Sequence, residues 1–108
     1  MTTLLIITTL PDTESAHRLA TDLVEAKLAA CINILPSTTS VYRWQGKTET
    51  ACEIPLLIKT RADRYPAVEA AIRSAHPYEL PEIIAVNIDK GLPEYLNWVA
   101  NESSPGSK

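Results

Sequence analysis

The sequence predicts an α+β fold of the ferredoxin-like, split βαβ class, with the order β-α-β-β-α-β and an added C-terminal helix. Apolar runs of the kind that form buried strands begin at Leu4 and at Ile83. Between two segments with helical spacing lies a long stretch, residues 31–60, that is typical of a β-hairpin. This order places both helices on one face of a four-stranded antiparallel sheet, so the other face needs a cover.

The first strand and helix follow directly from local patterns. Leu4 to Thr9 is a short apolar run with β-branched residues, which predicts a central strand. Asp12 or Thr13 can cap the helix that follows. Its apolar stripe consists of Ala16, Leu19, Ala20, Leu23, Val24 and Leu28. His17 falls on the opposite face, so we expect it to be solvated.

The hairpin turn is predicted at Gln45-Gly46, where Gly46 can adopt a positive φ. A two-residue loop there places Trp44 opposite Lys47. If that register continued unchanged, Ile58 would lie opposite Asn33, which is a poor pair.

One extra residue near Pro36-Ser37 instead places Ile58 opposite Ile32. Because a slip of one residue moves every side chain to the other face, we infer a bulge at this point.

The hairpin arms are about twice the usual strand length of roughly 5–6 residues. A domain of this size has no core wide enough to cover them, so we expect the segment Val41 to Thr50 to project. Exposed strands that carry Tyr42 and Trp44 invite pairing with another chain, and both residues are predicted to lie in an oligomer interface. The alternatives are a hairpin curled over its own domain and an aromatic platform for a ligand. Glu49 and Glu53 on the same hairpin are interpreted as surface charges.

The second half of the chain is predicted to hold a helix, a strand and a short last helix. The helix spans Asp63 to Ala75, with Asp63 as its cap. The run Ile83 to Ile88 is nearly continuously apolar, which favours a strand buried on both faces. The last helix begins near Pro93. Its predicted buried residues are Leu92, Tyr95, Leu96 and Val99.

Size and composition limit the class of protein. The 108 residues fit one domain, residues 1–101, followed by a polar, flexible tail at 102–108. A net charge of −3 without a basic run argues against nucleic-acid binding. No apolar stretch reaches the roughly 20 residues that span a membrane. The first residues lack the basic region of a signal peptide, so we expect a cytoplasmic protein.

The two cysteines, Cys31 and Cys52, lie far apart along the predicted hairpin. A disulfide needs Cα atoms within about 7 Å, so both are expected to be reduced, as in a reducing cytosol. Their spacing does not match a zinc motif.

Motifs of common enzymes are missing from the sequence. The three glycines are scattered, which excludes a phosphate-binding loop, and there is neither a serine elbow nor HExxH. A hydrolase of acylphosphatase type would need a basic, glycine-rich loop after the first strand, and the segment 8–12 is not one. We therefore expect no enzymatic activity.

One group of residues could bind a metal ion: His76, Tyr78, Glu79 and Glu82, in a loop stiffened by prolines. An imidazole beside carboxylates suits Cu(II), Zn(II) or Ni(II), and His76 with Glu79 is the candidate ligand pair. A single histidine binds weakly, so a neighbouring subunit or a cysteine would have to complete the site. The alternative is a histidine held by backbone hydrogen bonds, with both glutamates solvated.

Several motifs together resemble the CutA family of divalent-cation tolerance proteins, over Leu4 to about Asn101. They are Thr8-Thr9 with Pro11-Asp12, residues 25–31 (EAKLAAC), 40–47 (SVYRWQGK), 57–60 (LIKT), His76-Pro77-Tyr78 with Pro81-Glu82, and Tyr95-Leu96 with Trp98. The resemblance implies a ferredoxin-like homotrimer whose long hairpins reach neighbouring subunits. It also implies tolerance to copper and other divalent metals, and a likeness to PII-type signalling trimers.

The chain departs from one pattern of this family. Some members carry a cysteine at the position of Thr8 and a second histidine at that of Ala75, both proposed as copper ligands together with the histidine matching His76. Only His76 is retained here. The first hypothesis is thus a cytoplasmic, non-enzymatic homotrimer that binds copper or another divalent cation weakly. The second is a PII-like signalling or scaffold trimer that holds a small molecule or a partner in clefts between subunits.

Overall fold

The computed structural model describes residues 1–105 and has the predicted order of elements. The first half of the chain contains β1 (Thr3–Leu10), α1 (Thr13–Glu25), β2 (Cys31–Ile34), β3 (Thr38–Trp44) and β4 (Lys47–Arg61). The second half contains a 3-10 turn (Ala62–Arg64), α2 (Tyr65–Ala75), β5 (Ile83–Asn87) and α3 (Pro93–Glu102). None of these helices is long and apolar enough to cross a membrane.

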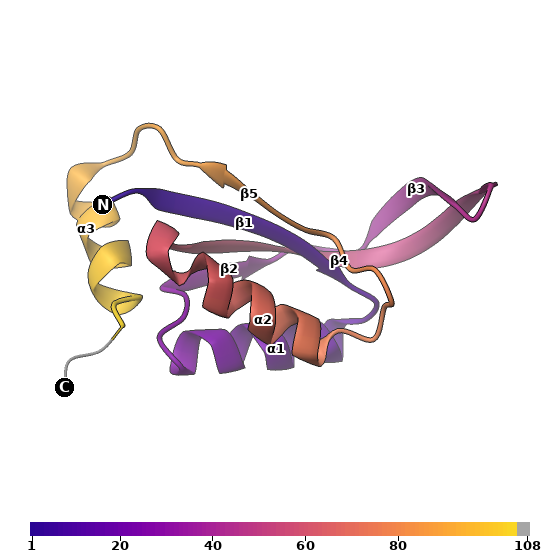
Figure 1. Cartoon of the computed structure of the whole chain (residues 1–108), viewed down its shortest axis with the longest axis horizontal. Helices are drawn as coiled ribbons and strands as arrows, with labels where there is room; N and C mark the ends of the chain where they lie inside the picture. The colour runs from indigo at the N-terminus through magenta and orange to yellow at the C-terminus, as the bar shows by residue number, and fades with distance from the viewer. Residues whose placement is uncertain (106–108) are drawn as a thin grey trace.

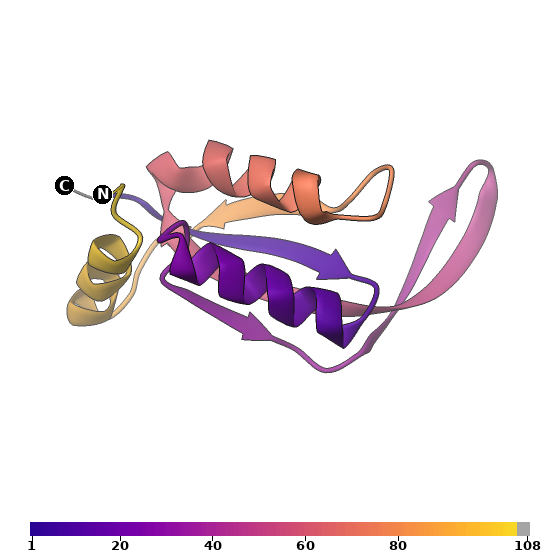
Figure 2. The same cartoon turned by 90° about the horizontal axis from the view of Figure 1, so that it is seen from below.

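The strands form an antiparallel sheet in the order β2-β4-β1-β5, which confirms the ferredoxin-like class and the central position of β1. The strand β3 pairs with the outer half of β4. Helices α1 and α2 lie next to each other on one face of the sheet, and α3 lies at the end away from the hairpin (Figures 1 and 2).

The core lies between the sheet and these two helices. The core consists of the even-numbered residues of β1, those of β4 from Ile54 onward, and the inner stripe of each of these helices. Those no more than 1% exposed include Ile6, Leu10, Leu23, Leu56, Ile58, Val68 and Ile72. Full burial of each such side chain contributes about 1.5–3 kcal/mol, so this face is the main source of stability. His17 points away from the core and is exposed, as predicted.

The predicted hairpin register and bulge are confirmed. Trp44 pairs with Lys47 at the tip, and Ile32 pairs with Ile58 at the base. The extra residue lies in the segment 35–37, between β2 and β3. At the tip Gln45 has a φ of 51° and Gly46 a φ of 82°, the left-handed pair that a tight hairpin turn requires.

The outer hairpin projects from the body, which gives the molecule its long axis of 46 Å (Figure 1). The Cα radius of gyration is 14.5 Å. A compact domain of this length would have about 13 Å.

The second helix does not begin as predicted. Asp63 lies within the 3-10 turn, and Arg64 occupies the N-cap position of α2. The Asp63 carboxylate instead accepts hydrogen bonds from the Arg61 guanidinium, at 3.0 and 2.8 Å. Asp63 therefore forms an ion pair with Arg61, two residues earlier in the chain, and does not cap the helix.

Burial of the last strand and helix is also less than predicted. β5 is an edge strand, in which Ile84 and Val86 are each 50% exposed. On α3 Val99 is buried and Leu96 half-buried, whereas Leu92 and Tyr95 are exposed. These side chains lie on surfaces that α1 and α2 do not cover.

The predicted tail at 102–108 falls partly outside the described residues, which end at Pro105. Within them α3 continues to Glu102, and Ser103 is fully buried. The Ser103 hydroxyl donates to the Val99 carbonyl at 2.6 Å, which fastens the end of the helix.

Candidate functional site

A cavity of about 700 Å³ lies between the projecting hairpin and the loop that follows α2. One wall comes from β3 and the other from the segment 78–82, while Thr9 and Glu53 line it from β1 and β4. Its lining residues are Thr9, Ser40, Val41, Tyr42, Arg43, Trp44, Glu53, Tyr78, Glu79, Leu80 and Glu82.

His76 lies beside this cavity, at the end of α2, and is buried. Its backbone is extended, as is expected before Pro77. Its Nδ1 accepts a hydrogen bond from the Tyr78 amide at 3.2 Å, and its Nε2 lies 2.5 Å from the Thr9 carbonyl oxygen. Since a carbonyl can only accept, Nε2 carries the proton, and the imidazole is neutral.

Glu53 connects the histidine to the cavity. Although it was interpreted as a surface charge, it is only 9% exposed, and the Thr9 hydroxyl donates to its carboxylate at 3.3 Å. Burial, and then the hydrogen bond and negative charge of Glu53, raise the pKa of the Tyr78 phenol. Tyr78, His76, Thr9 and Glu53 thus lie together at the base of the cavity, linked by the hydrogen bonds of His76 and Thr9.

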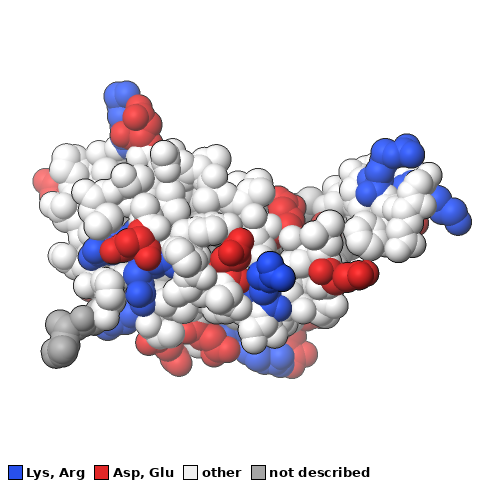
Figure 3. Space-filling view, viewed as in Figure 1, with Lys and Arg blue, Asp and Glu red and all other residues white. Residues whose placement is uncertain are grey.

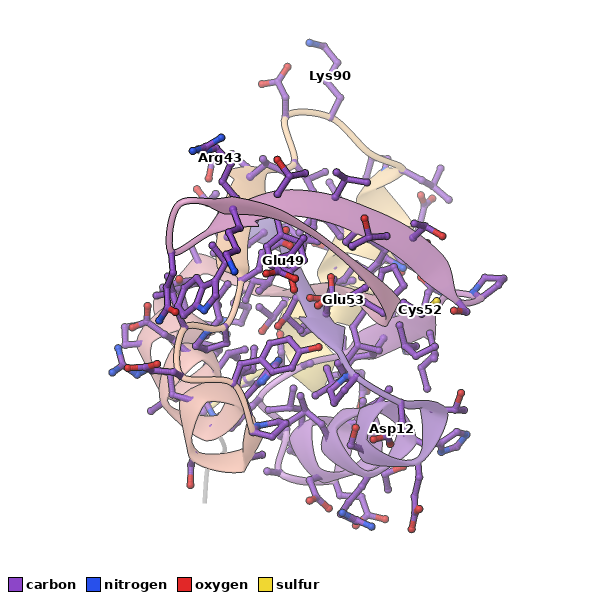
Figure 4. All side chains as sticks on the ribbon, turned by 90° about the vertical axis from the view of Figure 1, so that its right-hand side faces the viewer. Asp12, Arg43, Glu49, Cys52, Glu53 and Lys90 are labelled. Atoms are coloured by element: carbon purple, nitrogen blue, oxygen red, sulfur yellow. The ribbon has the colours of Figure 1, made fainter. Side chains whose placement is uncertain are left out.

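The charges around the cavity are unevenly distributed. Glu49 and Glu53 lie under the arch of the hairpin, whereas Arg43 points outward (Figure 4). The Arg43 guanidinium donates to the Gly46 carbonyl at 3.5 Å. Positive charge therefore gathers at the end of the hairpin (Figure 3), and the interior of the cavity is acidic.

The two predicted metal ligands are placed differently. His76 is buried with both ring nitrogens hydrogen-bonded, and Glu79 is exposed at the rim of the cavity. Within residues 1–105 no group of three or more His, Cys, Asp or Glu side chains is placed to hold a metal ion.

Thr8, at the position where some CutA members have a cysteine, is fully buried. Its hydroxyl has no hydrogen-bond partner in the described part of the chain. A hydroxyl is a poor copper ligand compared with a thiolate. The donors of a single chain therefore do not fit a copper site of the cysteine and two-histidine kind.

Both cysteines are free within the described residues, as predicted. Cys31 is half-buried, with its sulfur 4.0 Å from the Lys59 ammonium nitrogen, and Cys52 is exposed on β4. Neither lies in the wall of the cavity.

Tyr42 and Trp44 are 43% and 37% exposed, because their own chain covers part of each ring at the cavity. Their predicted place in an oligomer interface stays a prediction.

The fold and this arrangement define a class: a ferredoxin-like α+β protein with a projecting hairpin over an acidic, aromatic cavity. Residues 4–102 match the family described as "CutA1 divalent ion tolerance protein". The chain therefore belongs to the CutA1 divalent ion tolerance family.

Individual relatives agree with this assignment. The chain is 44% identical over 94 residues to the "Divalent-cation tolerance protein CutA" of Thermus thermophilus, covering 87% of this chain and 91% of the relative. It is 46% identical over 93 residues to the "Protein CutA homolog" of Xenopus laevis, covering 86% of this chain. It spans 62% of that Xenopus protein and 51% of the mouse protein CutA.

Solved structures show the same fold. The CutA1 structure from Oryza sativa gives a TM-score of 0.94 at 38% identity, with 98% of this chain and 97% of that chain covered. The structure from Thermus thermophilus gives 0.92 at 40% identity, with 94% and 99% covered.

Proposed function

We propose that the chain acts in divalent-cation tolerance as a cytoplasmic, non-enzymatic homotrimer that binds copper or another divalent cation weakly. Family membership carries the tolerance role. The proposed trimer rests on the uncovered face of the sheet, and the proposed weak metal binding rests on the hydrogen bonds of His76.

The uncovered sheet face supports the trimer. Register places Ile7 between Leu57 and Ile84, and Leu5 beside Val86, on the face opposite α1 and α2. Ile84 and Val86 are each half exposed in the single chain. A continuous apolar surface of this kind is typical of a protein–protein interface, and a closed homo-oligomer buries it in every copy.

The hydrogen bonds of His76 support weak binding. Because Nε2 carries the proton, a metal ion must bind at Nδ1 and displace the Tyr78 amide. Loss of such a hydrogen bond costs about 1 kcal/mol. Glu79 would be the second ligand, and a neighbouring subunit would complete the set.

The cavity favours a second candidate function, binding of a small molecule in a PII-like signalling trimer. Its volume of about 700 Å³ is within the range of roughly 300–1,000 Å³ that small-molecule sites occupy.

Copper titration separates the two candidates. The protein has two histidines, so His17→Ala, on an exposed helix face, is a matched control for His76→Ala. We expect calorimetry to show weak Cu(II) binding that His76→Ala abolishes and His17→Ala preserves. Glu79→Gln, at an exposed position, should weaken binding without any effect on folding. Equal binding by all of these proteins would reject the metal site.

Restoring the family pattern gives a second test. Thr8→Cys combined with Ala75→His supplies the missing thiolate and imidazole. We expect Cu(II) affinity to rise by at least about tenfold, since two soft or borderline ligands are added. Unchanged affinity would show that this end of α2 does not bind copper.

A further inference from the structure

We propose that the cavity beneath the hairpin binds a small organic ammonium cation, with Glu53 as its counter-ion and the rings of Tyr42 and Trp44 as its wall. The proposal rests on the second candidate function and names the chemical class of its ligand.

The first argument is the state of Glu53. A carboxylate that is only 9% exposed is costly to bury unless a cation or several hydrogen bonds compensate it. Its hydrogen-bond partner is the neutral Thr9 hydroxyl, and the phenol of Tyr78 lines the same cavity. None of the ion pairs found within residues 1–105 includes Glu53. A carboxylate has about four acceptor positions, so some stay open toward the cavity.

The second argument is the charge of the remaining lining. Glu79 and Glu82 stand in the opposite wall, and both are exposed at the rim. Arg43 is the one cation in the lining, and its side chain turns outward to the Gly46 carbonyl (Figure 4). A cation that enters the cavity therefore meets carboxylates on two sides.

The third argument is aromatic. Tyr42 and Trp44 are two residues apart on β3 and so share one of its faces, and Tyr78 lines the cavity from the other wall. Ring faces attract cations, most strongly when the cation is poorly hydrated. Magnesium-like ions keep their water and need oxygen ligands, whereas an alkylammonium presents an apolar, charged surface to the rings. The mixture of rings and carboxylates therefore favours the organic cation.

The experiment uses the full-length protein, ¹⁵N-labelled, with tetramethylammonium as the probe. The chain has two tryptophans, so its spectrum holds two indole N–H signals. Trp44 lies in the cavity wall, and Trp98 lies on α3, which is at the end of the molecule away from the hairpin (Figure 1). We expect a saturable shift of the Trp44 signal, with the Trp98 signal unchanged.

Glu53→Gln keeps the shape and can still accept from Thr9 and Tyr78, so it tests the charge alone. We expect at least about a tenfold loss of affinity, the size of one charge-assisted interaction. Because Glu53 is buried, a double variant at exposed positions, Glu79→Gln with Glu82→Gln, provides a test independent of folding and should weaken binding about two- to fivefold. Glu14→Gln, on the exposed face of α1, should bind as the wild type does.

Three outcomes would overturn the proposal. The first is an equal shift of both indole signals, and the second is unchanged affinity in Glu53→Gln. The third is an equal response to tert-butanol, which has a similar shape without charge. This third outcome would reject the ammonium ligand while small-molecule binding in the cavity would still hold. Copper titration of His76→Ala is independent of all these results.

Discussion

The two halves of β4 differ in what covers them. The inner half, 54–61, pairs with β1 on one side and with β2 on the other, and Leu56 and Ile58 are fully buried there. The outer half, 47–53, pairs only with β3 within the described chain, and most of its residues are exposed or half-exposed. One strand is therefore part of the core of its own subunit at one end and lies outside that core at the other.

This difference separates stability from assembly. The inner half stabilises each subunit, because it fills the core beneath α1 and α2. The outer half contributes little to that core, so the aromatic residues of its partner strand β3 must act through the cavity or a neighbouring chain.

The largest expected effect is a loss of stability from a substitution in the inner half of β4. Ile58→Ala removes a fully buried side chain and should lower the free energy of unfolding by about 2–5 kcal/mol. Val41→Ala, on β3 opposite the outer half, where the side chain is 67% exposed, should change it by less than about 0.5 kcal/mol. Urea denaturation of both variants measures the difference. Equal losses would mean that the hairpin and the body form one core.

The next effect concerns assembly. Trp44→Ala removes a large apolar side chain whose full burial contributes about 1.5–3 kcal/mol, and a symmetric trimer repeats the loss in each copy. We expect a thermal midpoint that falls on dilution more steeply than that of the wild type. Scanning calorimetry over a hundredfold dilution series measures this. A variant with a wild-type midpoint at every concentration would place Trp44 outside the interface.

A smaller effect, on local opening of the hairpin, is expected from a substitution at its tip. Gly46→Ala puts a β-carbon on a residue with a φ of 82°, which costs about 1 kcal/mol. We expect the outer-hairpin amides to exchange roughly fivefold faster, while those of β1 are unchanged. Gln45→Gly, which relieves the neighbouring left-handed residue, is the control and should not accelerate exchange. Faster exchange in β1 would show that the two halves unfold together.

The smallest effect lies at the first helix, far from the outer half. The Ser15 amide donates to the Asp12 carboxylate at 2.7 Å, and this bond is the main reason that the pKa of Asp12 lies below 3.8. A lowered folded-state pKa means that the contribution is present at neutral pH and is lost as the pH falls through that pKa.

Asp12→Ala should therefore lower the thermal midpoint at pH 7 and match the wild type at pH 2. Asp12→Ser, a neutral cap, should keep most of the midpoint at both pH values. A difference between Asp12→Ala and the wild type that persists at pH 2 would contradict this assignment.

Much of the sheet could be predicted from the sequence because its register is a local problem. Matching apolar partners across the hairpin indicated the bulge, and the pair Ile32 and Ile58 confirms it. The edge position of β5 could not be predicted in this way. An apolar run shows that Ile84 and Val86 belong under a cover, and it does not say whether the cover is the same chain.

The cavity was beyond sequence reasoning for another reason. The four linked residues come from two strands and the loop after α2, and Thr9 and Glu53 are 44 residues apart. Only His76 and Tyr78 stood out beforehand, since they are neighbours in a proline-rich loop. A glutamate in an otherwise polar strand, such as Glu53, carries no signal of burial. The prediction that Asp63 caps α2 was wrong because Arg61 competes for its carboxylate.

The bulge at residues 35–37 has a consequence for insertions and deletions. Because side chains alternate along β3, one residue added or removed there, if taken up by a shift of β3 and not by the bulge, moves Tyr42 and Trp44 to the face that Val41 and Arg43 now occupy. Two residues added or removed restore the original arrangement. The length of this segment is thus constrained by parity, and an odd shift would turn both rings to the other face of β3 even if every other residue were kept.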